Sequence, residues 1–511
     1  MMKILEIING FVWGFPALIL ILGVGIYLSV ATGFAQVVLF PRALRSFFAK
    51  LRPIRSEGGA ISPFQALCTA LAATVGTGNI AGVAGAIAIG GPGAIFWMWI
   101  CALFGMVTKF AEAALAVHFR TRDENGDLVG GPMYMIRKGM GKRWTWLASV
   151  YCLFGVIAAF GMGNATQVNA VVTGINSALG TFGAAETGVG NFLMGIALAA
   201  LITVLLLGGA KRIGRIAELL VPFAAAAYLL LCLGVLLCNA QAVPGAFRAI
   251  VTGAFAPKAI TGGMLGSAFT ALRVGVSRGV FTNEAGMGTA AIAHAAAQVR
   301  HPVEQGLMGI MEVFLDTVVI CTMTALVILC SGTDIHYGVD EGAALTTRAF
   351  AATYGDWISI PIALFLCCFA FATMLGWGLY GIRCAQYLFG GSAWKPFVLV
   401  QAGIVIVSTL LQTGTVWMLS ETVNGLMAIP NLLALAALSP VLVRLTKEYK
   451  VHYGGDSANG GTYESFDQRK PLRTVTYAQI SSPGSGGGEK RKEYLPSEHR
   501  SAGYQDTAGV L

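Results

Sequence analysis

Residues 69–91 read TALAATVGTGNIAGVAGAIAIGG, an apolar stretch with two glycines, a threonine and an asparagine at its centre. Glycine costs roughly 1 kcal/mol relative to alanine inside a helix. An asparagine in the middle of a bilayer is also costly unless its amide is satisfied. We therefore predict a membrane helix that is broken at Gly76-Thr77-Gly78-Asn79. Free amides at such a break can hold a carboxylate, and free carbonyls can hold a cation.

The composition is that of a polytopic, all-α membrane protein. Of the 511 residues, 56% are hydrophobic and 12% are charged, whereas soluble domains carry roughly 25% charged residues. The apolar runs are too long for the alternating segments of a β-barrel. The net charge of +9 comes from basic residues in loops, which indicates membrane topology rather than nucleic-acid binding. No CxxC…CxxC, HExxH or Walker motif is present, and we expect no cofactor.

Eleven apolar runs are predicted to cross the membrane. Basic residues concentrate in alternate connections, so the positive-inside rule places the N-terminus outside and the C-terminus in the cytoplasm. Only the segment Val243–Ile260 runs against this bias, and we predict a helix on the outer surface there. The runs cover residues 8–34, 65–90, 93–117, 146–178, 191–209, 216–238, 264–297, 303–330, 357–381, 396–412 and 423–443.

An internal repeat relates the first broken helix to a later one. Thr69-Ala70-Leu71, Val75 and Gly78 match Thr270-Ala271-Leu272, Val276 and Gly279 at one constant offset. The predicted topology gives the two stretches opposite directions, as in the inverted repeats of many secondary transporters. The second break is predicted at Gly275–Gly279, followed by Thr282–Gly288. The predicted parts are 1–56 (an extra N-terminal helix and basic loop), 57–240 (first five-helix repeat), 241–446 (outer segment and second repeat) and 447–511 (a disordered tail).

Two further spans carry polar groups that suit a small solute. Asn164 and Gln167 place carboxamides on one helix at membrane depth, where they need a ligand, water or an opened backbone. Thr373 and Trp377 are four residues apart and share a helix face. A hydroxyl there suits a hard cation such as Na⁺, and the indole would limit the size of a pocket. Interhelical hydrogen bonding and simple packing remain the alternative readings for both spans.

Ionisable side chains inside the spans are few. Such residues are paired or functional by default, and structural ion pairs, cation coordination and proton coupling all remain open for them. Glu312 and Asp316 are four apart, and either arginine of the repeat could neutralise them or Glu284. No nucleophile–base arrangement accompanies these carboxylates, so we do not predict an enzyme. The candidate coupling or ion-pair residues are Arg273, Arg278, Asn283, Glu284, Glu312 and Asp316, and Glu112 is a further acid.

At these residues the sequence resembles the alanine/glycine:cation symporters, also called sodium:alanine symporters, over roughly residues 10–450. The combination of motifs is specific, although each alone would be weak. The motifs are ATVGTGNIAGVAGAI (Ala73–Ile87), GGPMYMI (Gly130–Ile136), GNATQVN (Gly163–Asn169), SRGVFTNEAGMGTAAIAHAAA (Ser277–Ala297) and FATMLGW (Phe371–Trp377).

The resemblance implies a fold like that of the leucine transporter LeuT, a five-plus-five inverted repeat, with one extra N-terminal helix. It implies Na⁺-coupled uptake of alanine or glycine across the bacterial inner membrane, with H⁺ replacing Na⁺ in some members. It places Na⁺ at the carbonyls near Ala73 and Gly76 and at Thr373. Substrate contacts are implied for Gly76, Thr77, Gly78, Asn79, Asn164, Gln167, Thr373 and Trp377.

One departure from the family pattern bears on the cation. Ala372 stands where the family usually shows serine, which removes a possible hydroxyl ligand beside Thr373. An H⁺-coupled symporter or a symporter of another small solute is therefore the alternative on the same fold. A channel is a different class, which would conduct ions without saturable solute uptake. The sequence leaves open the preference between alanine and glycine, the stoichiometry and the oligomeric state.

Overall fold

The computed structural model describes residues 2–13, 15–51, 61–124, 126–181, 183, 185–256, 268–410 and 413–453, all within one compact unit. The described residues are almost entirely helical, as the composition predicts. One two-stranded antiparallel hairpin, β1 (Thr121–Arg122) and β2 (Leu128–Val129), is present among them. Of the predicted tail, residues 447–453 continue the last helix, and the remainder lies outside the described residues.

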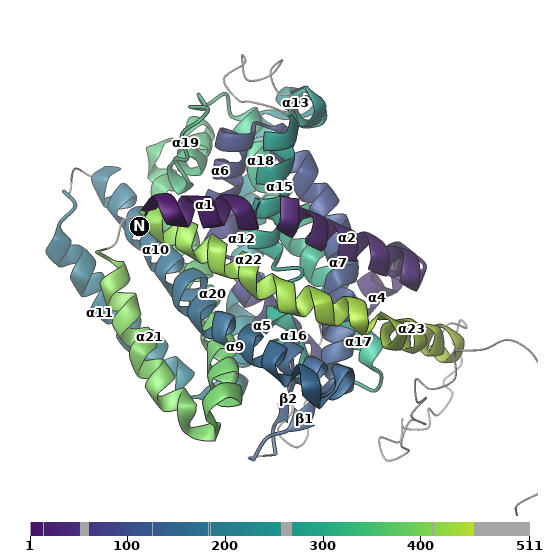
Figure 1. Ribbon diagram of the computed structural model, residues 1–511. Helices are drawn as coiled ribbons and strands as arrows, with labels where there is room; N and C mark the ends of the chain where they lie inside the picture. Colours follow the sequence, from purple (N-terminus) through teal and green to yellow (C-terminus); the bar gives the residue numbers. More distant parts are fainter. Residues whose placement is uncertain are drawn as a thin grey trace, which may run out of the picture. The chain divides into compact units, whose positions relative to one another are not determined.

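The first half of the chain begins with two helices that lie along a late one. In Figure 1, α1 (Met2–Val12) and α2 (Phe15–Thr32), in purple, run beside α22 (Thr413–Ala437), in yellow-green. The remaining helices of this half are α3 (Ala35–Val38), α4 (Phe40–Lys50), α5 (Pro63–Thr74), η1 (Thr77–Asn79), α6 (Ala81–Gly90), α7 (Gly93–Phe119), α8 (Pro132–Met135), η2 (Ile136–Met140), η3 (Lys142–Trp144), α9 (Thr145–Phe160), η4 (Gly161–Ala165), α10 (Thr166–Thr181), α11 (Gly188–Leu206) and α12 (Gly209–Cys238).

The second half opens with the predicted surface segment, which forms η5 (Ala240–Ala242) and α13 (Val243–Phe255); residues 257–260 of that prediction lie outside the described residues. The last element, α23, is bent by 59° from the end of α22. The helices of this half are α15 (Ala268–Asn283), α16 (Thr289–Ala295), α17 (Pro302–Val313), η6 (Phe314–Cys321), α18 (Thr322–Cys330), α19 (Ala343–Tyr354), η7 (Asp356–Ile358), α20 (Ser359–Phe389), η8 (Gly391–Ala393), α21 (Trp394–Ser408), α22 and α23 (Ser439–Tyr453).

By length and apolar composition, 8 helices of the described chain can cross a membrane, or 9 if the bent pair α22–α23 counts as one. The predicted number of eleven is therefore not reached by this criterion. The two runs that fail it, 65–90 and 264–297, are each divided into shorter helices. Because an α-helix rises about 1.5 Å per residue, pieces of this length span only part of a bilayer core about 30 Å thick.

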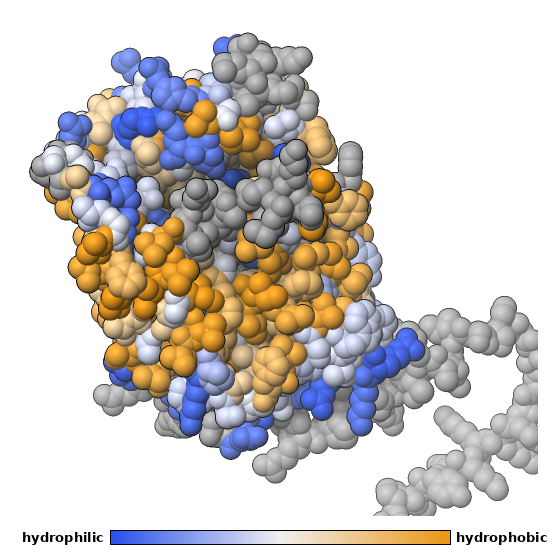
Figure 2. All heavy atoms as spheres, turned by 60° about the vertical axis from the view of Figure 1, so that its left-hand side comes forward, coloured by the Kyte–Doolittle hydropathy of each residue, from blue (hydrophilic) through white to orange (hydrophobic). Residues whose placement is uncertain are grey.

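The surface of the unit has the polarity of a membrane protein. Figure 2 shows an apolar belt with hydrophilic residues gathered above and below it. Large apolar side chains of α12 point outward, including Leu219, Phe223, Leu230 and Leu237, which are 78, 73, 69 and 68% exposed. In water such a continuous exposed patch would be unfavourable. These faces therefore fit contact with lipid, and the chain is a multi-pass membrane protein.

The two broken helices lie side by side and run in opposite directions. Ile61, before α5, forms a bridge with Ala297, after α16. At the other end, a Cβ on Gly90 of α6 would lie 3.1 Å from Val274 Cβ of α15. The beginning of one broken helix thus meets the end of the other, which is the antiparallel relation predicted from the repeat.

The second break does not lie where the glycine pattern predicted it. Gly275 and Gly279 are inside the continuous helix α15. A Cβ on Gly275 would lie 2.4 Å from Ala94 O, so this glycine permits close packing of α15 on α7. The chain leaves the helix only at Glu284–Gly288. There Glu284, Gly286 and Gly288 have φ of 54°, 94° and 76°, and a left-handed backbone ends a helix.

Candidate functional site

The first broken helix starts at a capping box and breaks at the predicted position. Ser62 Oγ accepts from the Gln65 backbone N–H at 3.0 Å, and the Gln65 side chain accepts from the Ser62 N–H at 3.1 Å. Helix α5 ends at Thr74, and Gly76 has an extended backbone before the single turn η1. The cap fixes the start of α5, so the break lies at a defined depth.

The break exposes backbone groups of both polarities inside the protein. Among the described residues, no hydrogen bond reaches the carbonyls of Ala73, Thr74 or Val75, and the N–H groups of Thr77 and Gly78 find no acceptor. All five residues are buried. Buried backbone groups are normally paired, so this arrangement leaves donors for an anion and acceptors for a cation.

Asn79 holds the break together and joins it to a distant helix. Its Oδ1 accepts from the Gly76 N–H at 2.9 Å. Its Nδ2 donates to Asp316 Oδ1 at 2.7 Å and lies 3.3 Å from both Asp316 O and Cys321 Sγ. The Asn79 side chain is therefore fully used in positioning the turn. A direct substrate contact, as the resemblance implied, would require it to change partners.

Helix α20 approaches the first break through Thr373. The Thr373 hydroxyl donates to Ala72 O at 3.1 Å. A Cβ on Gly76 would lie 2.6 Å from that hydroxyl oxygen, and a Cβ on Gly376 would lie 2.9 Å from Ala73 Cβ. Both glycines are thus required for the close approach of α5 and α20. Gly76 and Thr373, predicted to act together, are brought together.

The third core span supplies one carboxamide to the break. Thr77 Oγ1 donates to Gln167 Oε1 at 3.1 Å, and Gln167 Nε2 donates to Met162 O at 3.1 Å. The turn Gly161–Ala165 is a π-helix, which leaves such carbonyls available to side chains. Gln167 therefore lies at the site as predicted.

Asn164 is not joined to the break. Its Nδ2 donates to Ala159 O at 2.6 Å, and its Oδ1 accepts from Gln401 Nε2 of α21 at 3.0 Å. Its neighbour Asn169 donates to Ser408 O of the same helix at 2.5 Å. Interhelical bonding, the alternative reading from the sequence, accounts for both asparagines.

Trp377 connects α20 to the second break. Its indole N–H donates to Glu284 Oε1 at 2.7 Å, and Thr289 Oγ1 donates to Glu284 Oε2 at 2.5 Å. Trp377 and Glu284 are completely buried. On the other side, a Cβ on Gly163 would lie 2.4 Å from Trp377 Cβ. The indole is therefore fixed by Glu284, with its stem against the π-helical turn.

A buried ion pair crosses from α7 to α17 and continues to α16. Lys109 Nζ lies 3.0 Å from Glu312 Oε1, and both side chains have 0% exposure. Glu312 Oε2 lies 2.9 Å from His294 Nε2, and His294 Nδ1 lies 2.6 Å from Gln305 Nε2. Lys109 is absent from the sequence-based candidates, although its position three residues before Glu112 inside an apolar run is the signal that would have found it.

The predicted arginine pairing with these acids is wrong. Arg278 pairs instead with Asp340 Oδ2 and Glu421 Oε1, each at 3.1 Å. Arg273 is exposed, and no ion pair of the described chain includes it. Glu312 pairs with Lys109 instead of an arginine.

Asp316 belongs to a different polar group from Glu312. Its Oδ2 accepts from Thr317 Oγ1 at 2.8 Å, and Thr317 Oγ1 accepts in turn from Asn283 Nδ2 at 3.1 Å. The segment between the two acids enters the π-helix η6, which changes the helical spacing of two residues that are four apart. Asp316 instead connects the first break, through Asn79, to the last residue of α15.

The residues at the first break fit a small monovalent cation. Hard cations take oxygen ligands, and the unpaired carbonyls after α5 are of that type. The Ala73 carbonyl belongs to this set. Thr373 Oγ1 is bonded to the carbonyl of the preceding residue, Ala72. The Gly76 carbonyl already accepts from the Asn79 N–H at 3.3 Å. Thr74 and Val75 offer carbonyls that the sequence-based prediction did not name.

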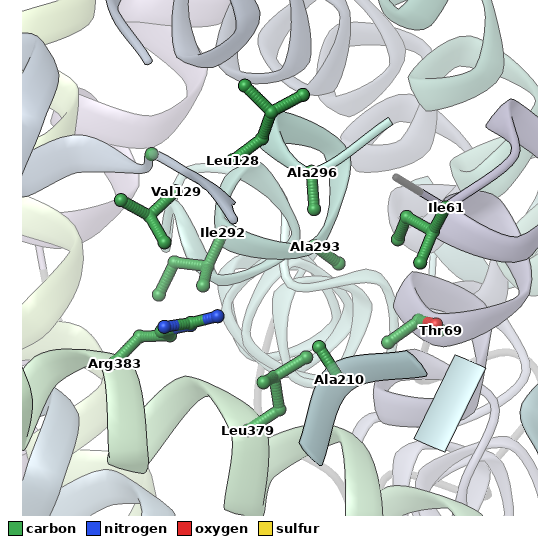
Figure 3. A pocket seen from close by; sticks show the side chains of 11 residues that line it. Ile61, Thr69, Leu128, Val129, Ala210, Ile292, Ala293, Ala296, Leu379 and Arg383 are labelled. Carbon is green, nitrogen blue, oxygen red and sulfur yellow. The ribbon is translucent and has the colours of Figure 1, made fainter. Parts of the chain in front are cut away.

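A pocket adjoins the helices of the site on the side of the β-hairpin. Thr69 of α5, Ile292 of α16 and Leu379 of α20 line it together with Ala210 of α12. Figure 3 shows the guanidinium of Arg383 directed into this pocket. Arg383 Nη1 lies 3.2 Å from Asp123 Oδ2 of the hairpin connection. Both broken helices and α20 therefore contribute to one hollow beyond the site.

Comparison with known proteins gives a consistent family assignment. The model of the sodium:alanine symporter family matches residues 1–459. The sodium/alanine symporter AgcS of Methanococcus maripaludis is 42% identical over 454 residues, which are 88% of this chain and 97% of AgcS. The probable sodium/glutamine symporter GlnT of Bacillus subtilis is 37% identical over 465 residues, 88% of this chain and 91% of GlnT.

A solved structure has the same type of fold. MhsT, crystallised in complex with L-phenylalanine, superposes with a TM-score of 0.52 at 15% identity, covering 77% of this chain and 99% of MhsT. At that identity the likeness concerns the fold alone. It agrees with the LeuT-like architecture that the resemblance implied.

Proposed function

This chain belongs to the sodium:alanine symporter family, and from that premise we propose that it carries alanine or glycine into the cell together with Na⁺ by alternating access. Na⁺-coupled amino-acid symport is the function of the chain, and its relatives are transporters rather than enzymes. The observation that carries the substrate proposal is the first break, whose unpaired amides and carbonyls lie beside Gln167 and Thr373.

The amino acid lies across the break in this proposal. Its carboxylate accepts from the N–H groups of Thr77 and Gly78, where the dipole at the start of a half-helix favours negative charge. Its ammonium group donates to oxygen acceptors. One of these is Gln167 Oε1, which is bonded to the Thr77 hydroxyl at the break. Trp377, whose indole is held by Glu284, is the proposed boundary at the side-chain end, which would limit the substrate to a hydrogen or methyl side chain.

Na⁺ takes the carbonyl side of the same break. The Ala73 and Thr74 carbonyls and the Thr373 hydroxyl are its proposed ligands, with Gly76 O as a further one once the turn relaxes. Carbonyls from α5 and a hydroxyl from α20 join two helices through the ion. Bound Na⁺ therefore stabilises the closed break that the substrate needs.

The proposed topology has eleven spans. Counting the bent pair as one, there are 9 candidate crossings. The two broken helices, α5–α6 and α15–α16, are the proposed tenth and eleventh spans. The N-terminus lies outside and the C-terminus in the cytoplasm, by the distribution of basic residues. The first span is the extra helix before two five-helix repeats.

The deciding experiment measures radiolabelled alanine uptake into proteoliposomes with an inward Na⁺ gradient, a proton gradient or neither. We expect stimulation by Na⁺, competition by glycine and no competition by leucine. Thr373→Ala should abolish the Na⁺ stimulation, whereas Thr353→Ala, which removes a hydroxyl bonded to Asn239 after the end of α12, should not. Normal Na⁺-driven uptake by Thr373→Ala would refute the cation site.

A second candidate substrate is glutamine, because a relative that matches 88% of this chain is named a probable sodium/glutamine symporter. The same vesicles distinguish the two. Glutamine competition as strong as that of glycine would show that Trp377 does not set the size limit, and would leave Na⁺ coupling intact.

A further inference from the structure

Glu112 of α7 contacts the second break with only one of its carboxyl oxygens. Oε1 accepts from the Gly286 N–H at 2.9 Å, from the Gly288 N–H at 3.0 Å and from Asn431 Nδ2 at 2.7 Å. Oε2 has no partner among the described residues, although the side chain is completely buried. A buried oxygen without a partner requires an explanation, which is commonly an ion, a water molecule or a proton.

The side chain of Asn431, which is bonded to Glu112, also has a buried oxygen without a hydrogen-bond donor. Asn431 of α22 donates both to Glu112 Oε1 and to Gly286 O, at 2.7 and 2.9 Å. Its Oδ1 has no partner in the described part of the chain and is likewise buried. Glu112 and Asn431 are therefore bonded through Oε1 and Nδ2, and each keeps one unpaired acceptor oxygen, Oε2 and Oδ1. Two acceptors cannot bond to each other, but one hydrogen between them satisfies both.

The complete burial of Glu112 favours a neutral carboxyl, against the attraction of the nearby Lys109 ammonium. Lys109, one turn earlier on α7, forms its ion pair with Glu312 at 3.0 Å, and no ion pair among the described residues joins a cation to Glu112. An ionised carboxylate without a partner is expensive within a bilayer. The titratable groups that act on it electrostatically are Lys109 on α7, Glu312 on α17, Tyr151 on α9 and Tyr380 on α20. Helix α16, which packs on α7, carries His294, and the second break carries Glu284.

We propose that Glu112 is a proton-binding site, in which Oε2 carries a hydrogen donated to Asn431 Oδ1 while Oε1 caps the amides of the second break. A metal cation fits less well, because three N–H donors already point at this carboxyl. The space is also filled: a Cβ on Gly288 would lie 2.7 Å from Asn431 Oδ1 and 2.4 Å from Pro132 Cγ.

The proton would couple to the second break in a simple way. On release the O–H bond breaks, the proton passes to water and Glu112 becomes a carboxylate. The carboxylate strengthens the three bonds that Oε1 accepts, from Gly286, Gly288 and Asn431 Nδ2, but loses the bond to Asn431 Oδ1. Protonation thus adds a second bond between α7 and α22 and weakens the cap on the second break. This role in transport rests on the proposed symport, whereas the protonation itself does not.

Infrared spectroscopy of the purified full-length protein tests the protonation directly. Wild type at neutral pH should show a protonated-carboxyl C=O band, sensitive to hydrogen–deuterium exchange, that is lost in Glu112→Gln. Glutamine keeps a donor toward Asn431, so this variant should fold. Glu304→Gln, which removes a carboxyl paired with Lys50 at 3.4 Å, is the matched control and should leave the band unchanged. Asn431→Ala should shift the band of the retained acid. An unchanged spectrum in Glu112→Gln would overturn the proposal.

Uptake measurements on the same variants test the coupling. Alanine uptake driven by Na⁺ should lose its pH dependence in Glu112→Gln and keep it in Glu304→Gln. Reduced ²²Na⁺ binding in Glu112→Gln, with no carboxyl band in wild type, would assign a metal cation instead and refute the proton. Absence of alanine uptake by wild type under every gradient would refute the proposed substrate alone, since the infrared result does not depend on transport.

Discussion

At the scale of single residues, Trp377 and Glu284 form a buried pair in which each fixes the other. The indole N–H is the donor to Glu284 Oε1, and Glu284 has one of two left-handed backbones found outside glycine in the described chain. Such conformations persist only where the surroundings impose them. The pair therefore transmits the shape of the second break to the wall of the proposed pocket.

Trp377→Ala should enlarge the pocket and admit larger side chains. Leucine, which should not compete with alanine in wild type, should do so in the variant. Trp377→Phe keeps a ring but removes the bond to a buried carboxylate, worth about 1.5–3 kcal/mol, so alanine uptake should fall while leucine stays excluded. Competition by leucine that is equal in wild type and Trp377→Ala would remove Trp377 from the pocket. Trp394→Phe, at the partly buried first residue of α21, serves as the control.

Gly76→Ala should impair the protein for a steric reason. The new methyl group would lie 2.6 Å from Thr373 Oγ1, and overpacking of this kind costs about 1–3 kcal/mol. We expect a lower melting temperature and loss of alanine uptake. Gly82→Ala is the matched control, because nothing lies within 4 Å of its Cβ and it is inside helix α6. Equal melting temperatures for the two variants would contradict the close approach of α5 and α20.

At the scale of elements, the sequence located the first break and misplaced the second. Gly76–Asn79 combines glycines with polar residues, a combination that only an opened backbone or a ligand satisfies. Gly275 and Gly279 also interrupt an apolar run, but they pack against α7 within an intact helix. Glycine permits both close packing and a break, and sequence alone does not distinguish them. The deciding feature was Glu284–Gly288, where three residues adopt left-handed backbones.

The buried pair between α7 and α17 should behave as a unit. Lys109→Met should leave Glu312 as an uncompensated buried charge, and removal of one partner costs about 3–5 kcal/mol. Glu312→Gln should be similarly destabilising, because it leaves Lys109 unpaired. The double variant should recover much of the loss, since neither charge remains. Thermal unfolding in detergent measures all three; a double variant as unstable as the sum of the singles would show that the pair is not coupled.

At the scale of the whole molecule, the membrane character and the family motifs were predictable, whereas the charge partners were not. Basic residues in loops are read directly from the chain. The pairing of Arg278 with Asp340 and Glu421 joins three segments more than 60 residues apart and depends on how the helices pack. The same is true of Lys109, whose partner lies on a helix 200 residues later. Local patterns predict elements, but only packing selects between several possible partners.

The proposed orientation is tested with short epitope tags at the two ends of the chain in intact cells. A tag before Met1 should bind antibody without permeabilisation, and a tag after Leu511 should bind only after permeabilisation. Eleven crossings place the ends on opposite sides. If both tags label without permeabilisation, the number of crossings is even, and one of the proposed spans does not cross.

Helix α20 touches the first break through Thr373 and the second through Trp377. Because an α-helix advances about 1.5 Å per residue, these two points are about 6 Å apart along a rigid rod. The regular rise of the helix backbone therefore fixes the distance between its contacts with the two breaks, independently of side-chain rotamers. The fixed distance along α20 between Thr373 and Trp377 would then decide whether a side chain longer than a methyl group is accepted. Insertion of one residue between the two positions would rotate Trp377 by about 100° around the helix axis and abolish this selection by side-chain length.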